Sequence, residues 1–480
     1  MTSRNPLIQL GTVVAIAIVA LLAGNAVGTN NMDRLLYPLG GLILVVTVVN
    51  PFASLIIFLL LFTRFGSYAE IGPIQIGMAV YTALLFLVAF ARFLWREPWD
   101  RAATRSVTLM FIFMVYLGLS VVEASVNGIP FSDWGRGAYP LVVLCLAAVF
   151  ATTLQTRRQW NIAAGVFLFI IVSIGMGGVS DLGGRLGGAL LSPDVVSWGT
   201  TLIPAALMSL GMAMIVEKRE LHWGYLAMLA TGLFTAVMSP TRTVWVSAGL
   251  TVTLMAGVLF FRHRRPGTAL AVVAVALAIG GGTLLAWRYG GPTASWQQQT
   301  ARAQTLSHTS EDPSVLIRQE QIREAIRVFS ASPLIGAGLG YQYQYKIAFT
   351  SKYEKPNDFN HSDLANALAK TGLLGALLIY GFLITTVLAC VRLQKAARLP
   401  EERGMGMAAE CTLLVALVIG NSTPMLQDKG SALLLALIIG LVLSRLNILY
   451  REAAEEQAQQ DEDLSAAPET TPWAAPLADG

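Results

Sequence analysis

The sequence predicts an all-α polytopic membrane protein with about 12–14 transmembrane helices, and three observations support this fold class. Of the 480 residues, 55% are hydrophobic and 13% are charged, which is about half the charged fraction of a soluble globular domain. Apolar stretches recur at close to the roughly 20 residues that cross a bilayer core. Charged residues are confined to the connections between them. One membrane domain, 1–450, therefore takes almost the whole chain.

The predicted spans begin with an apolar run at 7–24, which could be mistaken for a signal peptide. We interpret it as a retained helix, because it is longer than the apolar core of a signal peptide and further spans follow. The stretch 35–65 is too long for one span, and Asn50-Pro51 in its middle favours two short helices. The fourteen predicted spans are 7–24, 34–50, 51–64, 73–92, 107–124, 139–155, 161–180, 195–216, 223–238, 243–261, 268–287, 363–391, 408–426 and 431–449.

Basic connections between the spans predict the topology. With fourteen spans and the N-terminus inside, all six connections rich in Lys and Arg fall in the cytoplasm, as the positive-inside rule requires. The tail 451–480 is acidic and poor in aliphatic residues, so we expect a disordered cytoplasmic extension. The six basic connections are 92–105, 157–158, 218–219, 262–265, 392–403 and 445–451.

This topology leaves one long loop, 288–360, on the periplasmic side. Connections of this length are unusual in compact domains and tend to carry function. Asp312-Pro313 is typical of a helix N-cap followed by proline at the first helical position. We therefore predict an amphipathic helix over 314–330 that stops before Ser332-Pro333. Its predicted apolar face consists of Val315, Ile322, Ala325, Ile326 and Phe329.

Two arginines are candidates for binding an anionic ligand. Arg318 lies on the apolar face of the predicted loop helix, where a guanidinium is costly unless it meets an anion or a carboxylate. Arg323 and Arg327 lie on its polar face. Arg242 ends the short turn Ser239-Pro-Thr-Arg242 between two spans, so it stays at the outer membrane boundary. A guanidinium there suits a phosphate or diphosphate, and the alternative is an arginine that contacts lipid head groups.

His361 is the candidate general base. It opens the span that follows the long loop, in Asn360-His-Ser-Asp-Leu364. The dipole at a helix N-terminus disfavours imidazolium and lowers the histidine pKa, which leaves a neutral ring near pH 7. A neutral imidazole can accept a proton from a hydroxyl. The alternative is a histidine that only caps the helix or bonds at the interface.

Two other features predict no chemistry. Gly336-Ala-Gly-Leu-Gly340 has the spacing of a phosphate-binding loop, but no predicted strand precedes it, so we interpret it as a flexible, close-packed turn. Cys145, Cys390 and Cys411 all lie within apolar stretches. We therefore expect no disulfide and no metal site at these cysteines.

Four motifs together resemble the O-antigen ligase and Wzy-type polymerase superfamily, and their order matches as well. The resemblance is sharp over 235–380, and 184–194 is similar to a weaker element of the family. The family usually has Asn where this chain has Ser362. The motifs are Ser239-Pro-Thr-Arg-Thr-Val-Trp245, Ile317-Arg-Gln-Glu-Gln-Ile-Arg-Glu-Ala-Ile326, Ser332-Pro-Leu-Ile-Gly-Ala-Gly-Leu-Gly340 and His361-Ser-Asp-Leu-Ala-Asn-Ala-Leu-Ala-Lys-Thr-Gly-Leu-Leu-Gly375.

The resemblance implies a metal-independent, cofactor-free, membrane-embedded glycosyltransferase with a GT-C-like fold in the bacterial inner membrane. Its donor would be an undecaprenyl-diphosphate-linked glycan on the periplasmic side, and its acceptor a saccharide or a lipid-linked saccharide. Membrane lipids and other polysaccharide-assembly proteins are the implied partners, with no nucleic acid. By this resemblance Arg242 and Arg318 bind the donor diphosphate, and His361 deprotonates the acceptor hydroxyl for inverting attack. Arg185 is a weaker candidate for the same pocket.

Two alternatives remain open at the level of sequence. The motifs do not distinguish a ligase that moves a finished glycan from a polymerase that joins repeat units. A lipid-linked oligosaccharide flippase, or another multi-span transporter, is the alternative from a different class. Transporters place ionisable residues or broken helices near the midplane. The predicted spans here are nearly free of ionisable residues at mid-depth, which favours the transferase.

Overall fold

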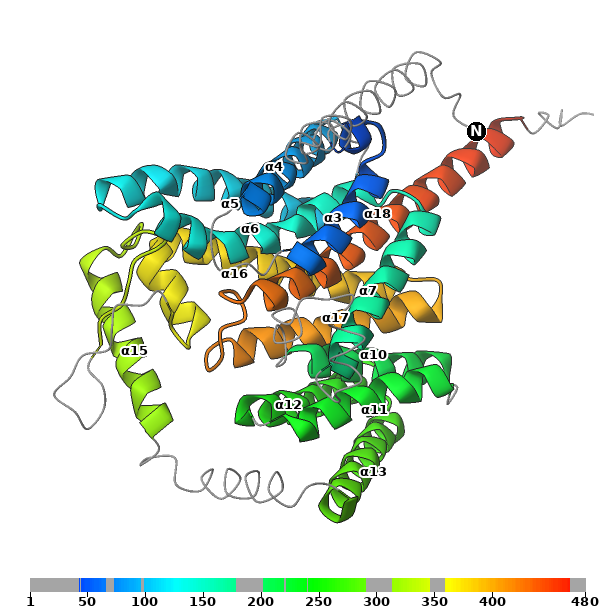
Figure 1. The fold of residues 1–480 in the computed structure, drawn as a ribbon. Helices are drawn as coiled ribbons and strands as arrows, with labels where there is room; N and C mark the ends of the chain where they lie inside the picture. Colours follow the sequence, from blue (N-terminus) through cyan, green and yellow to red (C-terminus); the bar gives the residue numbers. More distant parts are fainter. Residues whose placement is uncertain are drawn as a thin grey trace, which may run out of the picture.

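The computed structural model describes residues 43, 45–65, 73–95, 99–177, 202–219, 222–239, 241–290, 313–345 and 359–466, and helices make up most of them (Figure 1). Among these residues, five helices are long and apolar enough to cross a membrane. They are α5 (Arg101–Val126), α6 (Phe131–Thr153), α12 with its continuation η2 (Arg242–Gly257 and Val258–Arg262), α16 (Asp363–Ala396) and α18 (Lys429–Ala466).

The other helices are shorter or less apolar, and most coincide with predicted spans. The all-α polytopic membrane fold is therefore confirmed, while the predicted span 7–24 and most of 34–50 lie outside the described residues. These helices are α3 (Pro51–Phe65), α4 (Pro73–Leu94), α7 (Arg157–Gly177), α10 (Leu202–Lys218), α11 (Trp223–Met238), α13 (Pro266–Gly290), α15 (Pro313–Ala331) and α17 (Pro400–Ile419).

The first half of α18 forms the centre of the bundle. Its apolar window is buried along its whole length, as expected for a helix that is hydrophobic on every side. Gly440 lets α6 approach closely, because a Cβ there would lie 2.3 Å from the Cβ of Phe150. Trp160 of α7 donates its indole N–H to the carbonyl of Leu441 at 2.8 Å. The packing of α6 and α7 on α18 thus fixes the core around which the other helices are arranged.

The basic connections that were predicted to share one side of the membrane do lie together, at what we call the basic end of the bundle. Glu217 of α10 accepts contacts from Arg265 and Arg403 at 3.3 and 3.2 Å. Arg392 of α16 pairs with Asp100, just before α5, at 2.6 Å. Further ion pairs at this end join Lys218 to Glu401 and Arg262 to Glu410.

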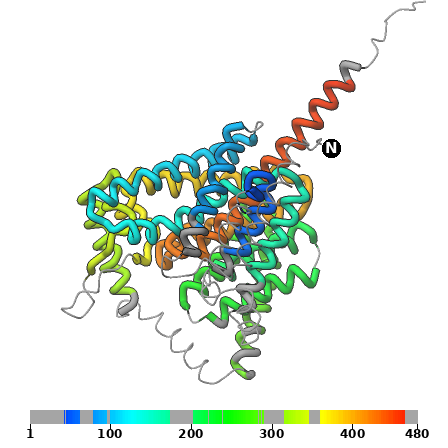
Figure 2. The backbone as a smooth tube through the Cα atoms, turned by 45° about the horizontal axis from the view of Figure 1, so that its top comes forward, coloured from blue at the N-terminus to red at the C-terminus, as the bar shows by residue number. Residues whose placement is uncertain are grey.

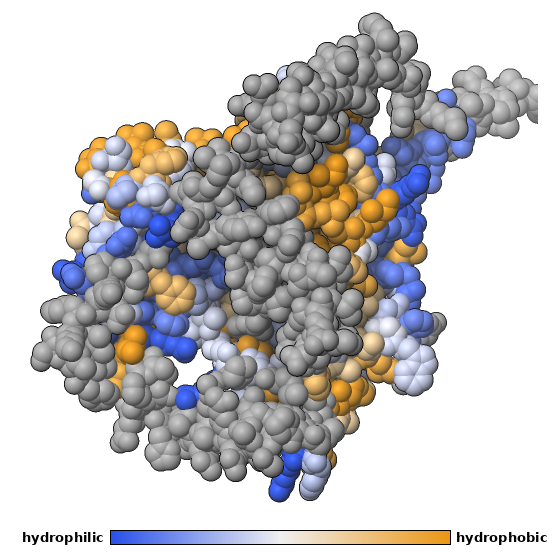
Figure 3. Space-filling model, in the orientation of Figure 1, coloured by the Kyte–Doolittle hydropathy of each residue, from blue (hydrophilic) through white to orange (hydrophobic). Residues whose placement is uncertain are grey.

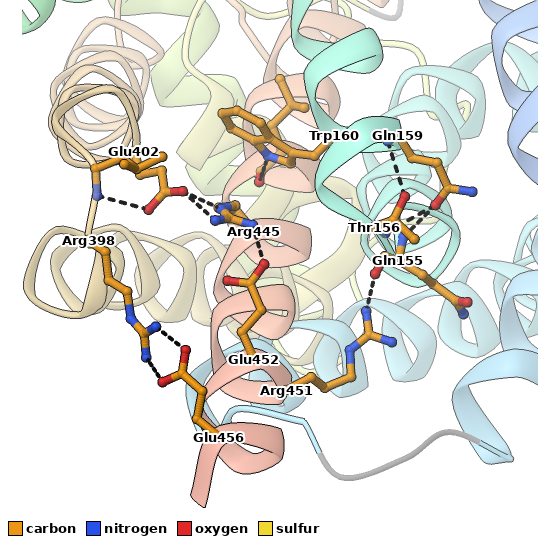
Figure 4. Close-up of polar contacts among 12 residues, drawn as sticks. Gln155, Thr156, Gln159, Trp160, Arg398, Glu402, Arg445, Arg451, Glu452 and Glu456 are labelled. Carbon is orange, nitrogen blue, oxygen red and sulfur yellow. Dashed lines mark hydrogen bonds and ion pairs between the residues drawn. The ribbon is translucent and has the colours of Figure 1, made fainter. Parts of the chain in front are cut away.

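A buried ion pair ties α17 to α18 at the basic end. Arg445 and Glu402 are 2% and 3% exposed, and the Arg445 Nε donates to Glu402 at 2.8 Å (Figure 4). Arg398 pairs with Glu456 farther along α18, and Arg451 donates to the carbonyl of Gln155 at 2.5 Å. Gln155 lies just before 157–158, and Arg445 and Arg451 bound 445–451, so these two connections also lie at the basic end. The six connections therefore lie at one end of the bundle, as predicted.

The structure differs from the disorder expected after Arg451. Helix α18 continues to Ala466 and projects from the bundle, as Figure 2 shows, while 467–480 lie outside the described residues. The extension is rich in Ala, Glu and Gln, which are strong helix formers. Because the buried half of α18 already provides the helical nucleus, each further residue only has to propagate it. Hydrophilic residues cover this extension, and hydrophobic residues lie over α3 (Figure 3).

Helix α16 is broken at Gly372, and its first part folds back along the bundle. Gly372 has φ 61° and ψ −168°, which is not helical. In a straight helix Asp363 and Tyr380 would lie about 25 Å apart. Instead Asp363 lines one small cavity together with Tyr380 and Leu383. We call 363–371 the folded-back helix, because it lies beside the part of α16 that follows the break.

The loop 332–340 closes this break with backbone hydrogen bonds. A break leaves carbonyl and N–H groups of the helix without their usual partners, and such groups need others when buried. Here two loop N–H groups donate to α16 carbonyls, and two N–H groups after the break donate to loop carbonyls. The bonds are Ala337 to Ala369 at 2.8 Å, Gly338 to Lys370 at 3.1 Å, Leu373 to Pro333 at 2.8 Å and Leu374 to Leu334 at 3.1 Å.

Glycines allow the two segments to come this close. Gly336, Gly338 and Gly340 have φ of 84°, 97° and 89°, a region that other residues rarely adopt. A Cβ on Gly336 would lie 2.5 Å from the backbone carbon of Lys370, and one on Gly372 would lie 2.4 Å from that of Leu334. The interpretation of 336–340 as a close-packed turn is confirmed.

Several predicted bounds are wrong, each for a local reason. Helix α6 begins at Phe131, within the predicted periplasmic segment 125–138, and Pro130 stands as its N-cap. Helix α13 continues to Gly290, so the long loop begins later than 288. The predicted span 408–426 is replaced by α17, which ends at Ile419. The irregular segment 420–428 follows, and it packs inward with Met425 and Leu426 buried.

Candidate active site

Helix α15 of the long loop begins at Pro313 and ends at Ala331, close to the predicted bounds. The predicted N-cap Asp312 lies outside the described residues. Its buried face differs from the predicted one, because Gln321, Ala325 and Val328 are buried while Ile326 is 56% exposed. This face packs on the folded-back helix around Ala369, together with Tyr343 and Tyr345.

The polar face of α15 is as predicted. Arg323 pairs with Glu320 at 2.5 Å and Arg327 with Glu324 at 2.6 Å, each one helical turn apart. Both arginines are 73% exposed, and ion pairs of this kind contribute little to stability. These two arginines therefore satisfy their charges on the surface of α15.

His361 is held against Gln321 of α15 immediately before α16 begins. Its Nδ1 lies 2.6 Å from the Gln321 Oε1, and its backbone N–H donates to the same oxygen at 3.3 Å. The Asn360 side chain donates to the backbone carbonyl of Gln321 at 2.9 Å. The ring of Phe359 packs against the imidazole edge to face, at 4.8 Å between centroids. His361 is thus held in a fixed position against α15, the helix that also carries Arg318.

Arg318 is close enough to His361 to change its protonation. It lies three residues before Gln321, on the same side of α15, and is half-buried. Burial, and then the positive charge of Arg318, lower the pKa of His361 from 6.5 to about 4. The direction agrees with the prediction, and burial and the charge of Arg318 are its causes here. The imidazole is therefore neutral at neutral pH.

Arg242 lies at the same end of the bundle as His361. It is the first residue of α12, and the preceding turn is fastened by the Trp245 indole N–H, which donates to the Ser239 carbonyl at 3.1 Å. Arg262, at the other end of the same continuous helix, pairs with Glu410 at the basic end. A helix of this length spans about 30 Å. The structure thus brings Arg318 and His361 together and places Arg242 at their end, while Arg185 lies outside the described residues.

Asp363, for which no role is predicted from sequence, anchors the start of α16 beside the candidate site. Its buried carboxylate accepts the backbone N–H groups of Met425 and Leu426 at 2.7 and 3.0 Å, and the Gln427 amide at 3.2 Å. Gln427 also donates to the carbonyl of Asn360 at 2.7 Å. Asp363 therefore ties the segment 420–428 to the start of the folded-back helix. No local pattern in the sequence could have paired these two segments.

Ser362 and Gln321 complete the framework around His361. The Ser362 hydroxyl accepts the Ala365 N–H at 3.2 Å and so caps α16. Because Asn and Ser are both good N-caps, the departure from the family pattern at this position keeps the local structure. No role is predicted for Gln321 from sequence, because its burial depends on the packing of α15 on the folded-back helix. Among the described residues there is no group of three His, Cys, Asp or Glu side chains that could hold a metal ion.

The family model described as O-antigen ligase matches 227–380, a range that contains Arg242, Arg318 and His361. Residues 227–380 are therefore similar to the O-antigen ligase and Wzy-type superfamily. The resemblance found in the four motifs is confirmed over this range, and the all-α membrane fold agrees with it. The family indicates an enzyme of the O-antigen ligase or polymerase type. The curated proteins include no match to the chain.

Proposed function

We propose that the chain transfers a glycan from undecaprenyl diphosphate to a hydroxyl of a saccharide or lipid-linked acceptor, at the periplasmic face of the bacterial inner membrane. The observation that carries this proposal is a neutral His361 held beside Arg318. A neutral imidazole can take the proton of an acceptor hydroxyl. A guanidinium can bind the diphosphate that leaves.

The proposed reaction is a single inverting displacement. The acceptor oxygen attacks the anomeric carbon, and its proton passes to His361 and then to solvent. The bond between that carbon and the diphosphate oxygen breaks, and both electrons leave with the lipid diphosphate. Arg318 and Arg242 bind the diphosphate and stabilise its growing negative charge. Because guanidinium groups supply this positive charge, the proposed reaction needs no metal ion or other cofactor.

Donor binding would also make His361 a better base. A histidine with a pKa of about 4 is neutral in the free protein but takes up a proton weakly. Part of that low pKa comes from the charge of Arg318. A diphosphate bound to Arg318 offsets this charge and favours the imidazolium that forms during transfer. The base would therefore become stronger when the donor is in place.

The charge of the opposite end of the bundle supports the proposed periplasmic location. The basic connections of the chain gather there, and the positive-inside rule assigns them to the cytoplasm. Helix α15, against which His361 is held, lies at the other end of the bundle (Figure 1). With that orientation the active site faces the periplasm, and the acidic extension of α18 lies in the cytoplasm.

Two features of the structure are also found in transporters. Gly372 breaks a membrane helix, and Glu410 is buried midway along α17, an exception to the expected lack of charge at mid-depth. However, the break is closed by backbone bonds to the loop 332–340. Glu410 accepts from Gln394 at 2.8 Å and pairs with Arg262, so its charge is compensated within the bundle. These contacts favour a structural role for both features and thus the transferase.

Transfer by the purified protein tests this proposal. The protein in detergent is mixed with an undecaprenyl-diphosphate-linked glycan and an acceptor saccharide, and the covalent product is separated by electrophoresis. We expect His361→Ala and Arg318→Ala to lose the product. Arg323→Ala is the matched control on the exposed face of α15, and it should keep normal transfer.

Normal product from His361→Ala would refute the proposed chemistry. A wild-type protein that moves the lipid-linked glycan across vesicle membranes without forming a new glycosidic bond would identify a flippase instead. The product also separates the two transferase types, since a polymerase gives a ladder of repeats and a ligase gives one conjugate.

A further inference from the structure

Gln321 holds His361 through several contacts that share one buried side chain. It is 2% exposed, and its amide nitrogen donates to the Tyr345 hydroxyl at 2.9 Å. Its Oε1 faces both the ring nitrogen Nδ1 and the backbone N–H of His361. Every polar atom of this side chain therefore has a partner, and the amide cannot rotate without losing one of them.

The orientation of the amide is fixed by a group that can only donate. Oxygen and nitrogen of a glutamine amide are assigned from their hydrogen bonds, and the Tyr345 hydroxyl can accept from the amide nitrogen or donate to the amide oxygen. The backbone N–H of His361 has no such choice, because it can only donate. The amide atom at 3.3 Å from that nitrogen must therefore be the oxygen.

This orientation determines the tautomer of His361. The Gln321 Oε1 is an acceptor, so the Nδ1 at 2.6 Å from it must carry the proton. If Nδ1 were unprotonated, its lone pair would face those of the amide oxygen at this short distance. In a neutral imidazole only one of the two ring nitrogens carries a proton. A proton on Nδ1 therefore leaves Nε2 unprotonated and able to accept one.

We propose that Gln321 is a positioning residue that keeps the proton of His361 on Nδ1 and so reserves Nε2 for the acceptor hydroxyl. The inference rests on the proposed function and deepens it. Gln321 does not touch the reacting atoms, and it acts by selecting which nitrogen is the base. At metal sites, residues that hydrogen-bond to a ligating histidine fix its tautomer and orientation. Their loss costs about 10- to 100-fold in metal affinity or activity.

Two substitutions separate this role from a purely structural one. Both keep the backbone carbonyl of residue 321, which holds Asn360. Gln321→Leu removes the acceptor, so we expect kcat to fall roughly 10- to 100-fold with little change in the KM for the donor. Gln321→Glu keeps an acceptor of the same length and adds a negative charge, which raises the pKa of His361. As the pH is lowered, this variant should therefore lose activity at a higher pH than the wild type does.

The control is Gln319→Leu, which changes an exposed glutamine two residues earlier on α15 and should leave kcat and the pH profile unchanged. Wild-type kcat in Gln321→Leu, together with an unmoved profile in Gln321→Glu, would overturn the inference. If Gln321→Leu does not fold, the pH profile of Gln321→Glu alone decides. An inactive wild-type protein would instead refute the proposed function, so the two failures are distinguishable.

A spectroscopic measurement tests the tautomer without activity. The full-length protein is labelled with ¹⁵N-histidine in lipid bilayers, and His361→Ala assigns the ring signals of His361. We expect a protonated Nδ1 and an unprotonated Nε2 at neutral pH, and a mixture of tautomers in Gln321→Leu. An unprotonated Nδ1 in the wild type would overturn the inference.

Discussion

The electrostatic coupling of Arg318 to His361 predicts a particular pH dependence of transfer. His361 acts as a base only when neutral, so activity falls as the pH drops through its pKa. In the free protein that pKa is about 4, against an ordinary value of 6.5. The pH profile of kcat/KM reports the free enzyme, and that of kcat reports the complex with substrate. We therefore expect kcat/KM for the donor to fall only as the pH approaches about 4.

The profile of kcat should fall at a higher pH than that of kcat/KM. The bound diphosphate offsets the charge of Arg318, one of the two causes of the low pKa, while burial of the ring remains. The midpoint for kcat is thus expected above about 4 and below 6.5. Replacing Arg318 with Gln removes the same charge without donor, so a titration of the His361 ring, which needs no transfer activity, should give a pKa above about 4.

The assay is the initial rate of transfer by purified protein from about pH 4 to about pH 8, with donor concentration varied at each pH. Arg327→Gln is the control, since that arginine pairs with Glu324 on the exposed face of α15. A kcat/KM profile that already falls near 6.5 would show that the free histidine is unperturbed. A kcat profile that falls at a lower pH than kcat/KM would show that the donor diphosphate does not offset Arg318.

Two further predictions concern the framework of the fold. Gly372→Ala places a Cβ 2.4 Å from a backbone carbon at a positive φ, so we expect a loss of about 1–3 kcal/mol or more in the free energy of unfolding, seen as a lower melting temperature. Gly381→Ala, whose new Cβ would lie 3.9 Å from the Leu109 side chain, should melt like the wild type, and equal melting of both variants would contradict the account of the break. Glu402→Ala leaves Arg445 buried without its closest partner and should cost about 3–5 kcal/mol. The double substitution Glu402→Leu, Arg445→Leu should recover most of that stability, and no recovery would show that the charge is not the cause.

The features that depend on local sequence could be predicted. Proline at the start of α15, the surface ion pairs of Arg323 and Arg327, and the close-packed glycines all follow from rules that act over a few residues. The shared location of the basic connections follows from a rule about sides of the membrane. Arg318 and His361 were chosen for their residue type and position, and the structure brings them together.

The features that depend on contacts between distant segments could not be predicted. Gly372 stands in an apolar stretch where a glycine is often tolerated within a helix, and only the loop 332–340 shows why the helix breaks there. Gln321 is buried because α15 packs on the folded-back helix, which overrides the apolar face expected from its sequence. The continuation of α18 was missed because composition alone does not reveal that a helix is already formed upstream.

The contact between the loop 332–340 and α16, which we call the seam, is made by main-chain hydrogen bonds. This affects which side chains of the protein can be substituted. Outward-pointing side chains on either segment can vary in size and polarity without opening the seam. The spacing between Arg318 and His361 is thereby insulated from such changes. The surroundings of the candidate site can then change while the spacing of Arg318 and His361 stays the same.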